Sequence, residues 1–252
     1  MSALSKTPRR MRGWMDLKVV AIKQETPDCI TASLQSPESQ DCPFDYIPGQ
    51  YLTFRFDNLA DKPVVRSYTM SSSPRNSESV EVTVKQIPDG LVSGYFCHQL
   101  KEGDCLRARG PIGRFVWDHS KDHPTLVMVA AGSGVTPFLS IVREYIDGTQ
   151  QVPQQMALLV SFRTRQDIID AEELLRWAEH ERFELCIQLT REQCSEHGYG
   201  RIDGAVLDTF LSKYTCGPAT YMTCGPEALM TSVVDYLQQA QVNPEDIKQE
   251  AF

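Results

Sequence analysis

Residues 66–71, Arg-Ser-Tyr-Thr-Met-Ser, place a cation, an aromatic ring and hydroxyl groups on successive positions of a short segment. If the segment is extended, Arg66 and Tyr68 point to one side and Ser67 and Thr69 to the other. A guanidinium binds phosphates, an aromatic ring stacks on a flat heterocycle, and hydroxyls form hydrogen bonds with the polar edge of that heterocycle. This pattern predicts a site for a flat, phosphate-bearing ligand lying against a strand.

A second stretch, Gly132-Ser-Gly134-Val-Thr136-Pro137, forms a glycine turn between an apolar run and a helical pattern. The first amide groups of a helix bind anions, so this turn predicts a phosphate or ribose site. The usual dinucleotide fingerprint has glycine where Pro137 stands, although proline is favourable in a first helical turn. Alone the motif is weak, and an ordinary strand-to-helix turn explains it equally well. Two such stretches on one chain suggest two nucleotides that face each other.

Between these stretches, Gly90-Leu-Val-Ser93 opens another helical pattern. The first amides of that helix would point at an anion, such as a diphosphate opposite Arg66. As an isolated motif, Gly90–Ser93 would be an ordinary helix cap. Because Gly90–Ser93 follows residues 66–71 in the chain, the two motifs together support a diphosphate site.

Arginines follow the ends of two apolar runs, at Arg163 and Arg165 and at Arg191, with Arg201 further on, and no acidic residue directly follows either run. A site selective for NADH generally has a carboxylate there for the ribose 2′-hydroxyl, whereas a 2′-phosphate needs cations. The arginines therefore favour NADPH over NADH. The alternative is that they are solvated surface residues.

Cys224-Gly225-Pro226 ends another apolar run, which places the Cys224 sulfur at the carboxyl edge of a sheet, where ligands bind. The eight cysteines form no C-x-x-C pair and the five histidines no metal spacing, so no metal site or iron–sulfur cluster is expected. Dispersed cysteines in a chain of this length indicate a cytoplasmic protein.

The elements that would position these residues change in kind along the chain. Six short runs rich in β-branched or aromatic residues, punctuated by turns, predict a small antiparallel barrel with one helix over 93–102. The runs are 17–22, 29–34, 51–56, 66–71, 80–84 and 105–109. From residue 124, apolar runs alternate with helical patterns at 137–146, 168–180, 203–213 and 227–239, which predicts a doubly wound parallel sheet. We expect a flexible tail over 1–13, the barrel over 14–120 and the α/β domain over 121–252.

The bulk composition restricts the function further. A net charge of −8 over 252 residues argues against a general nucleic-acid binder, which needs a basic face. The chain has no run of 18 apolar residues and no secretory h-region, so neither a membrane span nor a signal peptide is expected. We expect a monomer.

The ordered set of four motifs, beginning with Arg66-x-Tyr68-Thr69 and ending with Cys224-Gly225-Pro226, resembles the ferredoxin–NADP reductase superfamily over about residues 15–252. Within it, the chain looks most like reductase components of multicomponent oxygenases, such as that of phenylacetyl-CoA epoxidase, and like the reductase of the hybrid-cluster protein. Gly200-Arg-Ile-Asp-Gly204 favours the oxygenase group.

The resemblance implies FAD in the barrel and NAD(P)H in the α/β domain, with hydride transfer to flavin followed by single-electron steps to a ferredoxin, an oxygenase or another metalloprotein. It implies Thr69, Cys224 and Glu250 as catalytic residues. The residues implied to bind FAD are Arg66, Ser67, Tyr68, Thr69, Val84, Lys85, Ile87, Gly90, Leu91, Val92 and Ser93. Those implied to bind the nicotinamide nucleotide are Gly132, Gly134, Thr136, Pro137, Arg163, Thr164, Thr190, Arg191, Arg201, Cys224, Gly225 and Pro226.

The sequence departs from the family pattern after the expected strand at 247–252. Members with an appended plant-type [2Fe–2S] domain continue there, so this chain is either a compact reductase whose terminal Phe252 shields the flavin or a chain cut before the cluster domain. Two rival functions are a non-catalytic redox-sensing module that binds FAD or another nucleotide, and a free flavin reductase.

Overall fold

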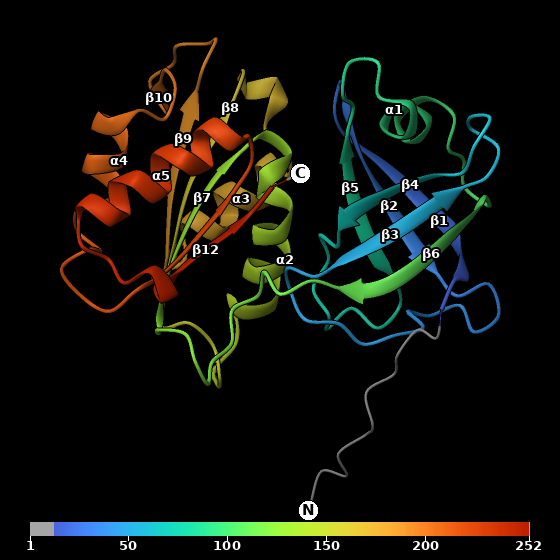
Figure 1. Cartoon of the computed structure of the whole chain (residues 1–252), viewed down its shortest axis with the longest axis horizontal. Helices are drawn as coiled ribbons and strands as arrows, with labels where there is room; N and C mark the ends of the chain where they lie inside the picture. The colour runs from blue at the N-terminus through green and yellow to red at the C-terminus, as the bar shows by residue number, and fades with distance from the viewer. Residues whose placement is uncertain (1–12, 252) are drawn as a thin grey trace, which may run out of the picture.

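The computed structural model describes residues 13–251; the predicted tail at 1–13, except Gly13, and the predicted role of Phe252 lie outside that range. The first half of the chain forms an antiparallel sheet of six strands, ordered β4-β3-β6-β1-β2-β5 (Figure 1). Its strands are β1 (Met15–Thr26), β2 (Cys29–Gln35), β3 (Tyr51–Phe56), β4 (Val64–Thr69), β5 (Val80–Lys85) and β6 (Cys105–Ile112).

A bridge between Met70 and Val82 joins the two outer strands of this sheet, β4 and β5, and closes it into a barrel. Helix α1 (Leu91–His98) packs over its interior, where Phe96 meets Phe54 edge-on at 5.8 Å between ring centroids. Alternation explains the fold, because Leu52 and Phe54 point inward while Arg55 lies nearer to solvent.

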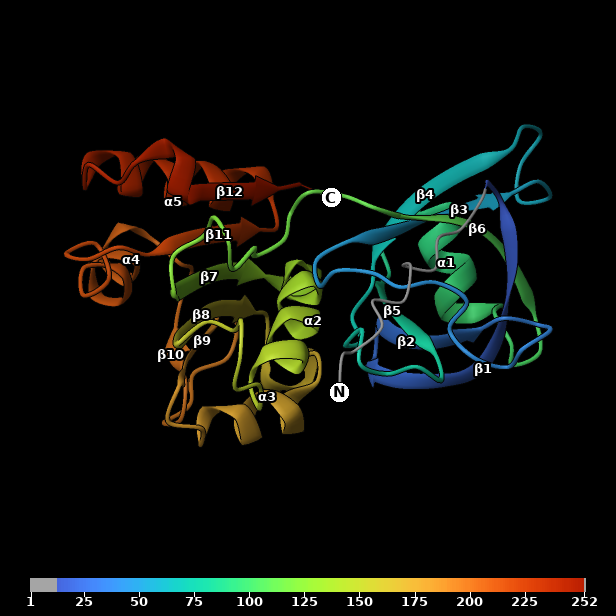
Figure 2. The ribbon, with the colours of Figure 1, turned by 90° about the horizontal axis from the view of Figure 1, so that it is seen from below.

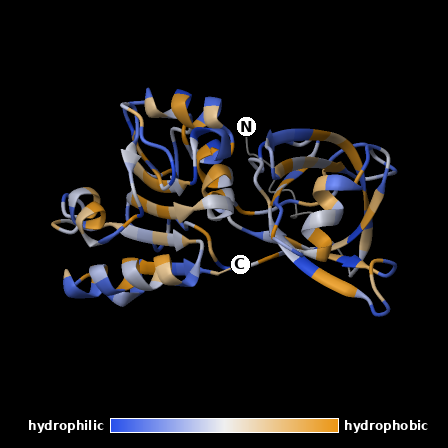
Figure 3. Ribbon diagram, turned by 90° about the horizontal axis from the view of Figure 1, so that it is seen from above, coloured by the Kyte–Doolittle hydropathy of each residue, from blue (hydrophilic) through white to orange (hydrophobic). Residues whose placement is uncertain are grey.

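The second half is a six-stranded parallel sheet, ordered β10-β9-β8-β7-β11-β12. Its strands are β7 (Thr125–Ala131), β8 (Gln155–Phe162), β9 (Phe183–Leu189), β10 (Gly198–Tyr199), β11 (Thr220–Cys224) and β12 (Ile247–Glu250). The antiparallel barrel followed by a doubly wound parallel sheet confirms the predicted fold class. Apolar residues gather in the strands at the centre of each half (Figure 3).

Helices cover both faces of the parallel sheet, in two separate apolar clusters. Helices α2 (Thr136–Tyr145) and α3 (Ala171–Ala178) pack on one face, and α4 (Gly204–Leu211) and α5 (Glu227–Gln239) on the other (Figure 2). Strands β7 and β8, at the centre of the sheet, are buried on both faces, so their sequences are nearly continuous apolar runs. None of the described helices is long and apolar enough to cross a membrane.

Three segments differ from the sequence-based expectations. Strand β10 was not predicted, because two residues carry no periodicity. It pairs with β9 beside the Gln188 side chain, which a Cβ on Gly198 would displace. Helix α3 begins at Ala171 rather than at 168, because Asp170 is left-handed at φ 52°. Helix α1 ends at His98, earlier than expected.

The two halves meet along α2 and the β1–β2 hairpin, through apolar contacts such as that of Phe115 with Phe138 and through several polar contacts. Ser140 Oγ donates to the Ser72 carbonyl at 2.6 Å, and Arg143 Nη1 to the Ser71 carbonyl at 2.7 Å. Lys23 of β1 pairs with Asp170 at 2.8 Å. These contacts fix how the barrel faces the parallel sheet.

Candidate functional site

Strand β4 and the first turn of α1 line a cleft of about 290 Å³ in the barrel. Tyr68 packs on Phe96 and Phe54, and burial raises the pKa of its phenol to about 12, so the ring is neutral. The Thr69 hydroxyl is buried and has no hydrogen-bond partner among the described residues. An unsatisfied buried hydroxyl beside a cleft is what a ligand with a polar ring edge would satisfy.

Arg66 is exposed at this cleft, and its side chain donates to the Val65 carbonyl at 2.8 Å. Within residues 13–251 no carboxylate pairs with it, so its charge is available to an anion. The Ser67 hydroxyl lies 3.0 Å from that of Thr53 on the neighbouring strand, and Ser67 also lines the cleft.

The N-terminus of α1 is shaped by Gly90 and Ser93. Ser93 Oγ accepts from the Ile87 amide at 3.1 Å and donates to the Gly90 carbonyl at 3.2 Å. A Cβ on Gly90 would lie 2.4 Å from that hydroxyl, so glycine is required there. No side chain caps the helix, which leaves its first turn facing the cleft.

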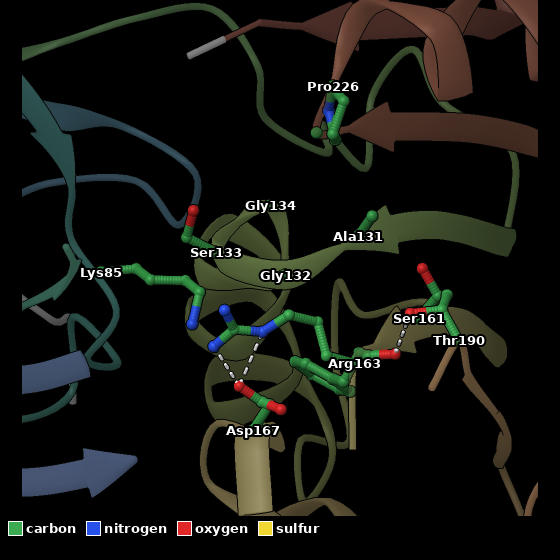
Figure 4. A pocket seen from close by; sticks show the side chains of 12 residues that line it. Lys85, Ala131, Gly132, Ser133, Gly134, Ser161, Arg163, Asp167, Thr190 and Pro226 are labelled. Atoms are coloured by element: carbon green, nitrogen blue, oxygen red, sulfur yellow. Dashed lines mark hydrogen bonds and ion pairs between the residues drawn. The ribbon is translucent and has the colours of Figure 1, made fainter. Parts of the chain in front are cut away.

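A second cleft, of about 380 Å³, opens at the carboxyl ends of β7, β8 and β11 (Figure 4). Gly132 in its wall has φ 55°, a conformation that favours glycine. A Cβ on Gly134 would lie 2.2 Å from the Cys224 carbonyl oxygen, so the backbone of this loop is in close contact with the end of β11 and leaves no room for a side chain. Gly225 and Pro226 complete this wall.

Two of the predicted phosphate-binding arginines are held by carboxylates. Arg163 Nη2 pairs with Asp28 at 2.6 Å and its Nε with Asp167 at 2.9 Å, while Arg165 pairs with Glu192 at 2.6 Å. No acid directly follows β8 or β9, as noted from the sequence, but these carboxylates reach the arginines from a distant hairpin and from the next turns. Arg163 and Arg165 stay predicted binding residues, but both share their charge with carboxylates that could not be expected from the sequence.

Arg191 and Thr164 line a third, shallow cleft beside Arg165 and Glu192. In the described part of the chain the Arg191 guanidinium has no ion-pair partner. Arg201 is exposed and lines none of these three clefts. Thr190 lines the second cleft.

Cys224 and Glu250 lie opposite each other on β11 and β12. Burial, reinforced by the Glu250 charge, raises the pKa of the Cys224 thiol, so the sulfur is an uncharged thiol at neutral pH. Burial also raises the pKa of Glu250 to about 7. Its carboxyl group therefore gains or loses a proton near neutrality.

The structure gathers most of the predicted site residues around the two larger clefts. The barrel cleft is lined by Arg66, Ser67, Tyr68, Thr69, Lys85, Ile87, Gly90, Leu91, Val92, Ser93 and Thr136. The second is lined by Lys85, Gly132, Gly134, Arg163, Thr190, Gly225 and Pro226. Val84 and Pro137 are buried in the packing behind them, and any role for Val84 would use its backbone.

Sequence reasoning missed several lining residues, and three of them had a usable signal. Ser133 lies inside the glycine motif and lines both clefts. Thr83 lies two positions before Lys85 on β5, so both point to the same side of the strand. Asp167 forms a capping box with Thr164, a spacing visible in the sequence. Ser161 and Phe162 gave none, because they end an ordinary apolar strand.

The two clefts adjoin, because Lys85 and Ser133 line both of them. The barrel cleft fits FAD: Arg66 offers an uncompensated cation, Gly90 keeps the helix turn open and Thr69 offers an unsatisfied hydroxyl. In residues 13–251 no three His, Cys, Asp or Glu side chains come together as a metal site would require.

Comparison with known proteins defines the class. Residues 16–117 match the oxidoreductase FAD-binding domain and residues 128–235 the oxidoreductase NAD-binding domain. The structure resembles a ferredoxin NADP+ reductase of Neisseria gonorrhoeae with bound FAD and NADP, at TM-score 0.79 and 22% identity, covering 96% of this chain and 99% of that one. A cytochrome P450 reductase of Amycolatopsis matches at TM-score 0.80 and 22% identity, covering 95% of this chain and 70% of that one.

Curated relatives narrow the class. The glycine betaine monooxygenase reductase subunit of Pseudomonas aeruginosa is 32% identical over 224 residues, covering 82% of this chain and 58% of the relative. The NADH oxidoreductase HCR of Escherichia coli is 32% identical over 213 residues, covering 82% and 61%. The chain thus spans about three fifths of the length of these relatives. Residues 16–117 therefore belong to the oxidoreductase FAD-binding domain family and residues 128–235 to the oxidoreductase NAD-binding domain family, and the chain has the fold of a ferredoxin NADP+ reductase.

Proposed function

We propose that this chain takes hydride from NAD(P)H onto FAD and passes electrons one at a time to an iron–sulfur protein or another metalloprotein. The observation that carries the proposal is the adjoining pair of clefts, which share Lys85 and Ser133. Ligands held in the two clefts would meet at this junction. The matches to FAD-binding and NAD-binding oxidoreductase domains support the same assignment.

FAD, when bound, supplies the step from two-electron to one-electron chemistry. In the barrel, Arg66 and the first turn of α1 would hold its diphosphate, Tyr68 would lie against its ring system and Thr69 would bond a polar ring edge. Thr136 lies in the same cleft, where its hydroxyl donates to the Ser133 carbonyl at 2.9 Å. Thr69 and Thr136 are both buried and both line the barrel cleft, whereas Cys224 is buried at the end of β11 and lines neither cleft.

We propose NADPH rather than NADH as the reductant, although fewer arginines now support this preference than the sequence suggested. Arg163 and Arg165 are already paired with carboxylates, so the preference rests chiefly on Arg191. A 2′-phosphate in the third cleft would find that guanidinium uncompensated. Glu192 in the same cleft opposes the preference, although its charge is shared with Arg165.

The acceptor is proposed from the relatives, whose names include the reductase subunit of glycine betaine monooxygenase and a ketosteroid monooxygenase ferredoxin reductase component. We propose an oxygenase, a ferredoxin or a [2Fe–2S] domain as the partner of this chain, which acts as a monomer. All eight cysteines are free thiols, which supports a reducing compartment such as the cytoplasm.

The test is turnover with a one-electron acceptor. The purified, FAD-loaded protein is mixed with NADPH or NADH and a [2Fe–2S] ferredoxin, and reduction of the cluster is followed optically. We expect flavin-dependent reduction of the ferredoxin. Reduction of added free FAD without ferredoxin reduction would favour a free flavin reductase, and a bound flavin that neither nucleotide reduces would favour a redox-sensing module.

A further inference from the structure

Asp28, in the two-residue turn between β1 and β2, lies where the barrel meets the second cleft. It accepts from Lys85 Nζ on one carboxylate oxygen and from Arg163 Nη2 on the other, the latter at 2.6 Å. Lys85 belongs to the barrel and Arg163 follows β8 of the parallel sheet. One carboxylate thus holds a cation from each half of the molecule.

These two cations are placed at the junction of the clefts. Lys85 lines both of them and Arg163 lines the second, and Figure 4 shows the two side chains extending toward each other. Like charges so placed repel unless an anion lies between them. Asp28 supplies that anion.

Asp28 is itself held in place. Thr26 Oγ1 donates to its carboxylate at 3.0 Å, and the Gln86 amide donates to its carbonyl at 2.7 Å. Burial opposes its ionisation, but hydrogen bonds from Lys85, Thr26 and Arg163 outweigh burial and lower its pKa. The Asp28 side chain is 24% exposed and that of Lys85 20%, so water screens this cluster only partly.

We propose that Asp28 is a positioning residue, which sets Lys85 and Arg163 as a preformed pair of cations for the diphosphate of the nicotinamide nucleotide. This inference rests on the proposed function and adds a residue to it. The Asp28 charge has two opposite effects: it competes with the diphosphate for both cations, and it fixes the direction from which they hold the ligand. Binding is therefore weaker than two free cations would give, and the bound nucleotide is better oriented.

The test separates binding from positioning. In the FAD-loaded protein, Asp28→Asn should tighten binding of ADP-ribose, a diphosphate that lacks the nicotinamide, by about three- to tenfold, because the competing charge is gone. The same variant should slow flavin reduction at saturating NADPH by about tenfold or more, since small displacements of a bound reactant are costly. Calorimetry gives the first quantity and anaerobic stopped-flow absorbance the second.

Two variants serve as controls. Asp57→Asn breaks a comparable arginine pair, Arg55–Asp57 at 2.7 Å, on the barrel surface and should leave both quantities at wild-type values. Asp28→Glu keeps the charge and should recover part of the reduction rate. Thermal melting of each variant checks that it is folded.

Unchanged or weaker ADP-ribose binding in Asp28→Asn, or an unchanged reduction rate, would overturn the positioning role while leaving the reductase proposal intact. A folded, FAD-loaded wild-type protein that neither binds ADP-ribose nor is reduced by NADPH or NADH would overturn both. The two failures are thus distinguishable.

Discussion

The two clefts offer a ligand different kinds of contact. The barrel cleft offers side chains: an uncompensated Arg66, the Tyr68 ring and the unsatisfied hydroxyl of Thr69. The cleft at the parallel sheet offers mainly backbone, because Gly134 packs against the Cys224 carbonyl, and the Arg163 cation is already engaged by Asp28 and Asp167.

This difference predicts different tolerances to mutation. A side-chain site weakens in steps as groups are removed, whereas a site built by close backbone approach fails when any Cβ is added. The cations also differ, since Arg66 can meet a ligand directly and Arg163 must share or leave its carboxylates.

The largest effect is expected at Gly134. In Gly134→Ala the new Cβ would lie 2.2 Å from the Cys224 oxygen and 2.9 Å from the Gly225 Cα. Both are backbone atoms, which cannot avoid the clash by a change of rotamer. Overpacking of this kind costs about 1–3 kcal/mol or more. We expect a lower melting temperature and loss of flavin reduction by NADPH. Gly204→Ala, where a Cβ meets nothing within 4 Å, is the matched control and should behave as wild type.

The next effect concerns FAD. Arg66→Ala should weaken FAD binding by about 10- to 100-fold, because one or two charge-assisted hydrogen bonds to the ligand would be lost. Flavin content after gel filtration and a fluorescence titration of the apoprotein measure it. The control is Arg55→Ala, another barrel arginine, which pairs with Asp57. Equal flavin loss in both variants would show that barrel stability, and not the cleft, controls occupancy.

A smaller effect is expected at the third cleft. Arg191→Ala should raise the KM for NADPH by about five- to tenfold and change that for NADH little, because only NADPH carries a 2′-phosphate. Steady-state kinetics with both nucleotides check this. Equal effects on the two would remove the case for NADPH.

The smallest effect is a pH dependence at Glu250. Its folded-state pKa of about 7 lies above the ordinary value of 4.5, so between these pH values the folded protein binds the extra proton. Stability contributed by this group is therefore lost as pH rises from about 4.5 to 7. In the wild type this group lowers the melting temperature at pH 8 relative to pH 5. In Glu250→Gln that contribution is absent, so the difference between the two pH values should shift by a few degrees in favour of pH 8. Glu245→Gln should show no such shift. A parallel shift at both pH values would contradict the assignment.

The sequence predicted the architecture well because each half has a clear period: short alternating strands in the barrel, and long apolar runs with intervening helices in the parallel sheet. It also predicted most cleft residues, since Arg66–Thr69 and the glycine turn are local motifs. It could not predict that Asp28, 135 residues from Arg163, would neutralise that arginine, because only the packing of the two halves brings them together. Left-handed Asp170 and two-residue β10 lacked any periodic signal.

The central claim is that two nucleotides meet at the junction lined by Lys85 and Ser133. The most direct measurement is anaerobic: the visible spectrum of the FAD-loaded protein is recorded as NADPH, and separately NADH, is added. We expect rapid bleaching of the flavin band, faster with NADPH than with NADH. A flavin that stays bound and fully oxidised with both nucleotides would contradict it.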